Sequence, residues 1–156
     1  MRLFAILATA GAIGVGGTIS GGGVQVRAPA GWHRVAPAPD KAVTEPQTLL
    51  VAGTAGVQAR RTQCQIAAYR VPAAGAVVVI VAWKMAHGQT GPGLSALAKL
   101  TAVHRPSFEC FKGRGAATQL VLRERIYQVN VMVGDRASQQ RIAEALAVAR
   151  SFRLKQ

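Results

Sequence analysis

The stretch GAVVVIVAWKM, at residues 75–85, is apolar on both faces of an extended strand. Its middle is built from Val and Ile, whose branched side chains favour strands. The run is too short to cross a membrane as a helix, which takes about 20 apolar residues. A strand without a polar face needs cover on both sides, so the sequence predicts a central strand with a layer packed against each face of its sheet.

Three shorter strands are predicted before this central strand, at residues 23–32, 48–54 and 61–71. Short apolar runs that alternate with polar residues, or that are bounded by turn residues, are typical of strands. The segment at residues 35–47 holds three prolines, which cannot donate to a strand ladder, and is predicted to be a loop. In the third strand Cys64 alternates with two glutamines, so its side chain is expected to point toward the core.

After the central strand the sequence predicts a loop, a hairpin and a helix. Residues 86–100 are rich in Gly and Pro and are expected to end in a single helical turn. Residues 116–135 contain two apolar runs joined tightly at the sequence RER, which indicates a hairpin. Residues 138–152 repeat apolar side chains with helical spacing, and Asp135 or Ser138 is expected to cap that helix. The predicted apolar face of the helix contains Ile142, Ala145, Leu146, Ala149 and Phe152.

Six strands and one helix predict an α+β domain, with a largely antiparallel sheet and the amphipathic C-terminal helix packed on it. The chain has 156 residues, half of them apolar, which is enough for one core of ordinary size without a metal ion. No repeat or linker divides the sequence. Residues 21–156 are therefore expected to form a single domain.

Residues 1–20 fit two interpretations. Arg2 is the one charged residue among them, and an apolar run extends over residues 3–15. That pattern is typical of a secretory signal peptide or a membrane leader, with Thr18 and Ser20 as the small residues before a cleavage site. The single cation and the many glycines fit a leader less well, and the same residues also fit the first strand of a chain without a leader.

The charge balance is strongly positive, because 19 Lys and Arg face 6 Asp and Glu and the formal net charge is +13. Such a charge attracts polyanions, among them nucleic acid, anionic lipid headgroups and acidic polymers of a cell envelope. The cations are scattered along the chain, which favours a general cationic surface over a dedicated nucleic-acid site. The candidate residues for this surface are Arg60, Arg61, Arg105, Lys112, Arg114, Arg123 and Arg125.

The sequence contains none of the motifs that usually carry chemistry. Its glycines fit neither a phosphate-binding loop nor a dinucleotide fingerprint. His33, His87 and His104 lie far apart, and with two cysteines they make no zinc signature. No serine stands in the sequence G-x-S-x-G. No catalytic residue, metal ion or cofactor is therefore expected, and the chain is predicted not to be an enzyme.

Cys64 and Cys110 are the only cysteines, and three interpretations remain open for them. Two cysteines in a chain with a candidate leader favour one disulfide bond. Two unpaired, buried thiols are the second interpretation. In the third interpretation, Cys110 is a reactive thiolate with His104 as its base, and the nearby cations stabilise it. These cations are Arg105, Lys112 and Arg114.

Five segments of the chain stand out together: APAGW, GAVVVIV, RPSFEC, the later RERIYQVNVMVGDRAS, and the closing ALAVARSF. They resemble a poorly characterised family of secreted or membrane-tethered proteins from high-GC Gram-positive bacteria. The order of an amphipathic helix, the dipeptide SF and a last extended segment also resembles the PsbP/Mog1-type sandwich, an antiparallel sheet with helices against it. These resemblances imply export or tethering, this fold, and a binding or assembly role without a catalytic motif.

The function expected from these observations is that of a non-catalytic domain, secreted or held in the cell envelope. Its cationic surface is expected to bind an anionic envelope component or another envelope protein, and nucleic acid is not the favoured partner. A cytoplasmic protein that binds nucleic acid or another polyanion is the alternative. A small thiol enzyme that uses Cys110 is the third hypothesis.

Overall fold

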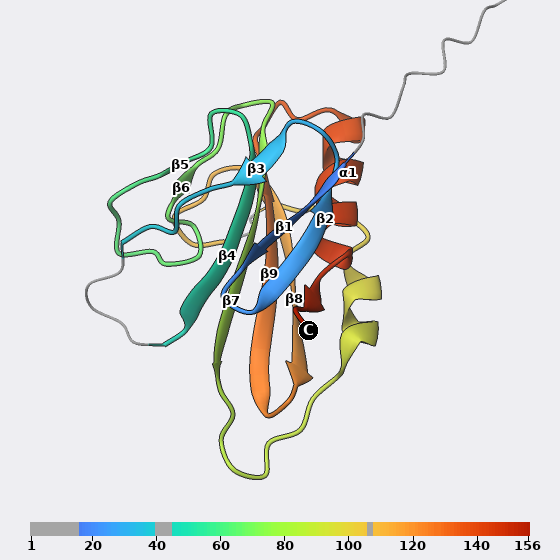
Figure 1. Ribbon diagram of the computed structural model, residues 1–156. Coiled ribbons are helices and arrows are strands. Elements are labelled where there is room, and N and C mark those ends of the chain that lie inside the picture. Colours follow the sequence, from blue (N-terminus) through green and yellow to red (C-terminus); the bar gives the residue numbers. More distant parts are fainter. Residues whose placement is uncertain (1–15, 40–44, 106–107) are drawn as a thin grey trace, which may run out of the picture.

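The structure, a computed structural model, describes residues 16–39, 45–105 and 108–156. In these ranges the chain forms three antiparallel sheets and one α-helix, an α+β fold as predicted (Figure 1). The order in the five-stranded sheet is β3 (Trp32–Arg34), β4 (Gln47–Thr54), β7 (Ala76–Lys84), β9 (Arg125–Val133) and β8 (Arg114–Leu122). The three-stranded sheet has the order β1 (Gly17–Gly21), β2 (Val24–Ala28) and β10 (Arg153–Leu154), and the two-stranded sheet pairs β5 (Gln58–Ala59) with β6 (Tyr69–Arg70).

Strand β7 is the middle strand of the five-stranded sheet, as the apolar run predicts. It pairs antiparallel with β4 on one side and with β9 on the other. Residues 76–82 are all buried. Their side chains alternate between two apolar clusters, with Val78 and Ile80 in the first and Val77 and Val79 in the second. Since successive side chains of a strand point to opposite faces, both faces of the sheet are covered, and the prediction of two layers is confirmed.

The first face of the five-stranded sheet packs against helix α1 (Gln139–Arg150), the 3₁₀ helix η1 (Leu94–Lys99) and the three-stranded sheet. Figure 1 shows α1 and β2 on the side of the sheet opposite to β5 and β6. The rings of Tyr127 on β9 and Phe152 after α1 lie 5.5 Å apart between centroids. The prediction that the amphipathic helix packs on the sheet is thereby confirmed.

Helix α1 begins after Ser138, whose Oγ accepts a hydrogen bond of 3.1 Å from the backbone N–H of Arg141. This contact satisfies one of the free N–H groups of the first turn, so Ser138 rather than Asp135 is the cap. The predicted apolar face is buried along its whole length, from Ile142 to Phe152. The helix was predictable because its apolar spacing and its cap agree.

The hairpin of β8 and β9 is also confirmed. The two strands pair from Arg114 opposite Val133 to Leu122 opposite Arg125. Arg123 and Glu124 form the turn, with left-handed φ angles of 47° and 61°. Two consecutive residues with positive φ match the twist of a two-residue hairpin turn, so the strands continue directly on either side of it.

The second face of the sheet is covered by irregular chain, with only the short pair β5 and β6 in it. Two segments, residues 57–71 and residues 108–112, supply this cover, and a disulfide bond between Cys64 and Cys110 joins them. We call these two segments with their disulfide the disulfide layer. Its buried members on the second face are Val57, Ala67, Ala68 and Tyr69, and Ile66, Phe108 and Phe111 lie half-buried at the margin.

The predicted strand at residues 61–71 is wrong, because only Tyr69–Arg70 is a strand there. Ala67 and Ala68 are both buried although they are consecutive, whereas the side chains of a strand alternate between its faces. The segment lies over the sheet as cover and does not join its ladder. Cys64 is accordingly half-buried at the margin of the core and not inside it.

The structure describes a strand before residue 21, the predicted start of the domain. Gly17–Gly21 forms β1 and pairs with β2 over its full length, with Thr18 opposite Arg27. Thr18 and Ser20, predicted next to a cleavage site, are therefore part of a sheet. The sequence left a leader and a first strand both open for residues 1–20. Glycine has a low strand propensity, and pairing with β2 overrides that propensity. Residues 1–15 of the predicted leader lie outside the described residues, so the leader itself stays a prediction.

Candidate functional site

The disulfide bond joins Cys64 and Cys110, whose Cα atoms are 6.4 Å apart. The predicted bond is confirmed, and it uses both cysteines of the chain. The sulfur of Cys110 is bonded to another sulfur, so it is not a free thiolate in this structure. The chemistry of this corner is therefore that of a covalent link between two surface segments.

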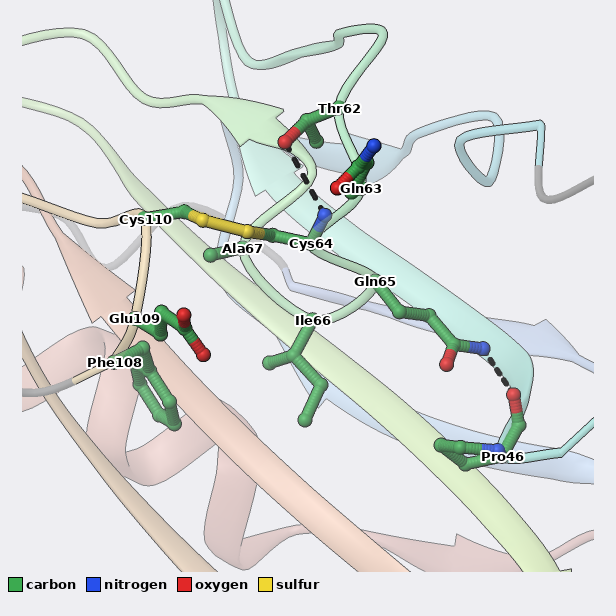
Figure 2. A pocket seen from close by; sticks show the side chains of 10 residues that line it. All are labelled: Pro46, Thr62, Gln63, Cys64, Gln65, Ile66, Ala67, Phe108, Glu109 and Cys110. Atoms are coloured by element: carbon green, nitrogen blue, oxygen red, sulfur yellow. Dashed lines mark hydrogen bonds between the residues drawn. A yellow bond between two sulfur atoms is a disulfide. The ribbon is translucent and has the colours of Figure 1, made fainter. Parts of the chain in front are cut away.

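An open pocket of about 660 Å³ lies beside the disulfide. Figure 2 shows Phe108 and Glu109 on one side of the pocket and Gln65 and Ile66 on the other, with the disulfide between the two segments. The two sides come from segments that are 46 residues apart at the cysteines. The disulfide thus sets the distance between the two sides of the pocket.

The pocket offers both polar and apolar surface. The Oγ1 of Thr62 accepts a hydrogen bond of 3.2 Å from the backbone N–H of Cys64, and the side-chain amide of Gln65 donates to the carbonyl of Pro46. The first contact stabilises the turn before Cys64, and the second attaches the segment that carries Cys64 to Pro46. Ile66 and Phe108 are half-buried and give apolar contact. Among the residues that line the pocket, Glu109 is the one with a carboxylate.

Cationic side chains surround this corner. A guanidinium nitrogen of Arg60 donates to the carbonyl of Cys110 at 2.7 Å and to that of Ala67 at 3.2 Å. Arg105 donates to the carbonyl of Lys112 at 3.2 Å. Arg60 thereby adds a second, non-covalent link between the two segments that the disulfide joins.

Four of the predicted cationic residues meet here, and we call them the corner cations: Arg60, Arg61, Arg105 and Lys112. All four are exposed. Across the residues that the structure describes, the one salt bridge joins Arg141 to Glu144, on helix α1. The corner cations therefore have no carboxylate partner within the described chain. None of them lines the pocket itself; they lie within a few residues of its lining segments in the chain.

The other predicted cations lie elsewhere. Arg123 and Arg125 stand at the far end of the hairpin from Arg114, about 25 Å away at the usual rise per residue of a strand. Arg125 lies over the ring of Tyr127, 5.8 Å from its centroid. Arg114 is half-buried and donates to the carbonyl of Ala137 at 3.2 Å. The seven candidates therefore do not form one surface.

His104, predicted as a base for a Cys110 thiolate, is held by its backbone. Its N–H donates to Gly115 and its carbonyl accepts from Gly115, at 2.9 and 3.0 Å. This isolated bridge gives β8, the edge strand of the five-stranded sheet, a paired neighbour at Gly115. The role that the structure gives to His104 is in strand pairing.

Tyr69 belongs to the disulfide layer and is only 2% exposed. Burial raises the pKa of its phenol above the ordinary value, and a hydrogen bond from the backbone N–H of Ala38 to the phenol oxygen, 3.1 Å long, lowers it in part. The phenol therefore stays neutral in the folded protein beyond the pH at which an exposed tyrosine ionises. Its position shows that the loop after β3 belongs to the second face.

Sequence reasoning missed the polar residues of the pocket, namely Thr62, Gln63, Gln65 and Glu109. A usable signal was present, because each lies next to one of the cysteines in the chain or within two residues of it. Residues that flank a disulfide on two separate segments must face a common space. The prediction of the bond could have been extended to a prediction of the cleft beside it.

Searches for other kinds of site found none in the described part of the chain. No three His, Cys, Asp or Glu side chains gather there in a way that would hold a metal ion. Of the helices in the described ranges, none has the length and apolar character needed to span a bilayer. Neither a protein-family model nor a curated protein sequence matches the chain.

Proposed function

We propose that this chain is an exported, non-catalytic domain of the cell envelope that binds an anionic envelope component at the disulfide corner. The observation that carries the proposal is the juxtaposition of an open pocket with four exposed cations that have no carboxylate partner. Cations left unpaired at a concave surface concentrate anionic ligands there.

Export is supported by the bond itself. Disulfides persist in oxidising compartments and are rare where glutathione and thioredoxin keep thiols reduced. The resemblance to secreted or tethered proteins of high-GC Gram-positive bacteria, and the apolar run at residues 3–15, point in the same direction.

The chemistry of the pocket suggests what the ligand looks like. Its amide and hydroxyl groups suit a ligand with neutral hydrogen-bonding groups, while Ile66 and Phe108 offer apolar contact. The corner cations around it suit negative groups spaced along a chain. An acidic polymer or an acidic segment of another envelope protein combines these features, with the chain in the pocket and the charges at its edge.

Binding of nucleic acid in the cytoplasm is the alternative. Surfaces that bind single strands interleave exposed aromatic rings with cations, so that bases stack on the rings. Here Phe108 and Phe111 are half-buried and pack against the second face. Cations without a carboxylate partner suit any polyanion, so the experiment below compares nucleic acid with an acidic polymer.

The test compares two triple variants of equal charge against soluble polyanions. The corner variant changes Arg61, Arg105 and Lys112 to Gln; the control changes Lys84, Lys99 and Arg123, which are exposed elsewhere on the molecule. We expect the corner variant to weaken binding of poly-glutamate at least tenfold at low salt, with a shallower salt dependence, because three ionic contacts are lost. The control variant should change binding less than threefold.

Equal losses in both variants would mean that net charge alone drives binding, and would overturn the proposal. A preference for duplex or single-stranded DNA that persists at physiological salt would instead favour the nucleic-acid alternative. Isothermal titration in a salt series measures all of these outcomes with the same protein samples.

A further inference from the structure

The outer face of the three-stranded sheet is defined by the side chains that do not enter the core. Val24, Val26 and Ala28 of β2 are buried, so Gln25 and Arg27 point outward. Residues paired across strands point to the same side of a sheet. Thr18 pairs with Arg27, and Ser20 and Arg153 both pair with Gln25, so these side chains also point outward. The outward side chains on the three strands are Thr18, Ser20, Gln25, Arg27 and Arg153.

This outer face is polar and cationic. Arg27 and Arg153 are exposed on it, and the exposed Lys155 follows directly, with its backbone N–H donating to the carbonyl of Gly23 at 2.9 Å. Carboxylates are located elsewhere in the described ranges: they belong to Glu45, Glu109, Glu124, Asp135 and Glu144, none of them on β1, β2 or β10. The face thus carries three cations and no acidic residue.

The chain enters this same sheet from an apolar segment. Strand β1 begins at Gly17, and residues 3–15 before it form an apolar run without a charged residue. Stable attachment to a membrane generally takes two signals, such as an apolar segment together with a cationic patch. Of the cations of the outer face, Arg27 lies on β2, which is next to the strand that follows this segment, whereas Arg153 and Lys155 lie on or just after β10, on the other side of β2.

We propose that the outer face of the three-stranded sheet lies against a bilayer that contains anionic lipids, with the apolar run at residues 3–15 as the second point of attachment. This proposal goes beyond the binding of a partner at the disulfide corner. The three-stranded sheet and the disulfide layer cover opposite faces of the five-stranded sheet. With the outer face on the membrane, the pocket beside the disulfide points away from it.

The test measures binding of the full-length chain to vesicles by co-sedimentation. Vesicles of phosphatidylglycerol and phosphatidylcholine are compared with vesicles of phosphatidylcholine alone. One variant changes Arg27, Arg153 and Lys155 to Gln. The matched control changes Lys84, Lys99 and Arg123 to Gln, which removes the same charge from exposed positions outside both the outer face and the disulfide corner.

Each cation near an anionic bilayer raises the binding constant about fivefold. The variant of the outer face should therefore bind anionic vesicles on the order of 100-fold more weakly than the unchanged chain, and the control variant at Lys84, Lys99 and Arg123 within about threefold of it. Binding to the neutral vesicles should be the same for all three proteins, because residues 1–15 are unchanged. The proposed function is tested with the corner variant and poly-glutamate, so the two proposals are tested by different residues and different probes.

Equal losses in the two variants would show attraction by net charge only, and no loss in the variant of the outer face would place the membrane contact elsewhere. Either result overturns the proposal. Arg153 also donates to the carbonyls of Arg150 and Phe152, so its replacement could weaken the fold. Thr18→Glu provides a second variant that keeps these bonds: it places a carboxylate opposite Arg27, and we expect at least a fivefold loss on anionic vesicles. Unchanged binding by Thr18→Glu would contradict the proposal equally.

Discussion

Tyr69 connects three parts of the molecule through one side chain. Its ring is buried in the second apolar cluster beside Val79, and its phenol oxygen accepts the N–H of Ala38. Its backbone belongs to β6, which pairs with β5. A buried hydroxyl that accepts a hydrogen bond stabilises the fold only while it keeps its proton, because the ionised form would be charged inside the core.

The pKa of Tyr69 gives a prediction about alkaline pH. A phenol whose pKa is raised by folding contributes stability below the unfolded value of about 10 and loses it as pH rises through the folded value. The unchanged protein should therefore lose stability steeply above pH 10. Tyr69→Phe should cost about 1 kcal/mol at neutral pH through the lost hydrogen bond, but show a shallower loss above pH 10.

Urea unfolding at a series of pH values, followed by circular dichroism, measures both effects. Absorbance at 295 nm shows when tyrosinate forms. Tyr127→Phe is the matched control, since it removes a phenol from the first face. If the slope above pH 10 is as steep in Tyr69→Phe as in the unchanged protein, another group is responsible.

At the scale of elements, α1 and the disulfide layer cover the two faces of the sheet by different means. Helix α1 presents a continuous apolar face, and Leu146 on it is buried in the first cluster. The disulfide layer has few internal backbone hydrogen bonds and depends on Cys64–Cys110 and Arg60 for its shape. The first face is therefore held by packing, and the second by links between segments.

Replacement of Leu146 tests the packing of α1. Leu146→Ala leaves a cavity between the helix and the sheet and should lower the free energy of unfolding by about 2–5 kcal/mol. Gln140→Ala, an exposed position on the same helix, should change it by less than about 0.5 kcal/mol. Thermal and urea unfolding of the two variants measure the contrast. Equal, small effects would mean that α1 is not part of the cooperative core.

The sequence predicted the elements whose periodicity is set by burial. The central strand, the hairpin and α1 each repeat apolar residues at the spacing of their own structure, so the pattern and the fold agree. The segment at residues 61–71 lies on the sheet without joining it. The positions of its apolar residues are set by the surface that they cover, so they do not repeat at the spacing of a strand or a helix. For β1 the sequence left a leader and a first strand both open, since its glycines gain their conformation from pairing with β2.

The candidate site was predictable in part for a similar reason. Cysteine number and the candidate leader were enough to predict the bond, because only one pairing exists. The grouping of four cations around it required the distance between segments 46 residues apart, which no local pattern contains. Arg114, Arg123 and Arg125 were assigned to the same surface by residue type alone, and the hairpin separates them.

For the whole molecule, the disulfide should matter most for the second face. The chain-entropy model gives about 4 kcal/mol for a closed loop of 46 residues. We expect a variant with both Cys64→Ser and Cys110→Ser to lose on the order of this amount. Hydrogen exchange should speed up at Tyr69 and Ala59 on the second face before it does at Val131 in the first cluster.

Urea unfolding and hydrogen exchange measured by NMR check these two expectations on the same variant. Thiol labelling of the native protein, denatured without a reductant, provides the control for the bond. Two labelled cysteines in that sample would contradict the structure at this point. A uniform rise in exchange over both faces would contradict the separate dependence of the second face on the bond.

If the chain is exported as proposed, the position of the disulfide determines what has left the translocation channel when the bond can form. Cys64 and Cys110 stand on either side of β7, and the neighbour of β7 on its other edge, β9, follows Cys110. A chain that leaves a translocation channel with its N-terminus first delivers both cysteines before β9. The oxidant can therefore close the ring while β7 has a neighbour only on the side of β4. During that interval the strand with the most apolar residues has an open edge, and it is this edge that an extracytoplasmic chaperone would have to shield from other chains.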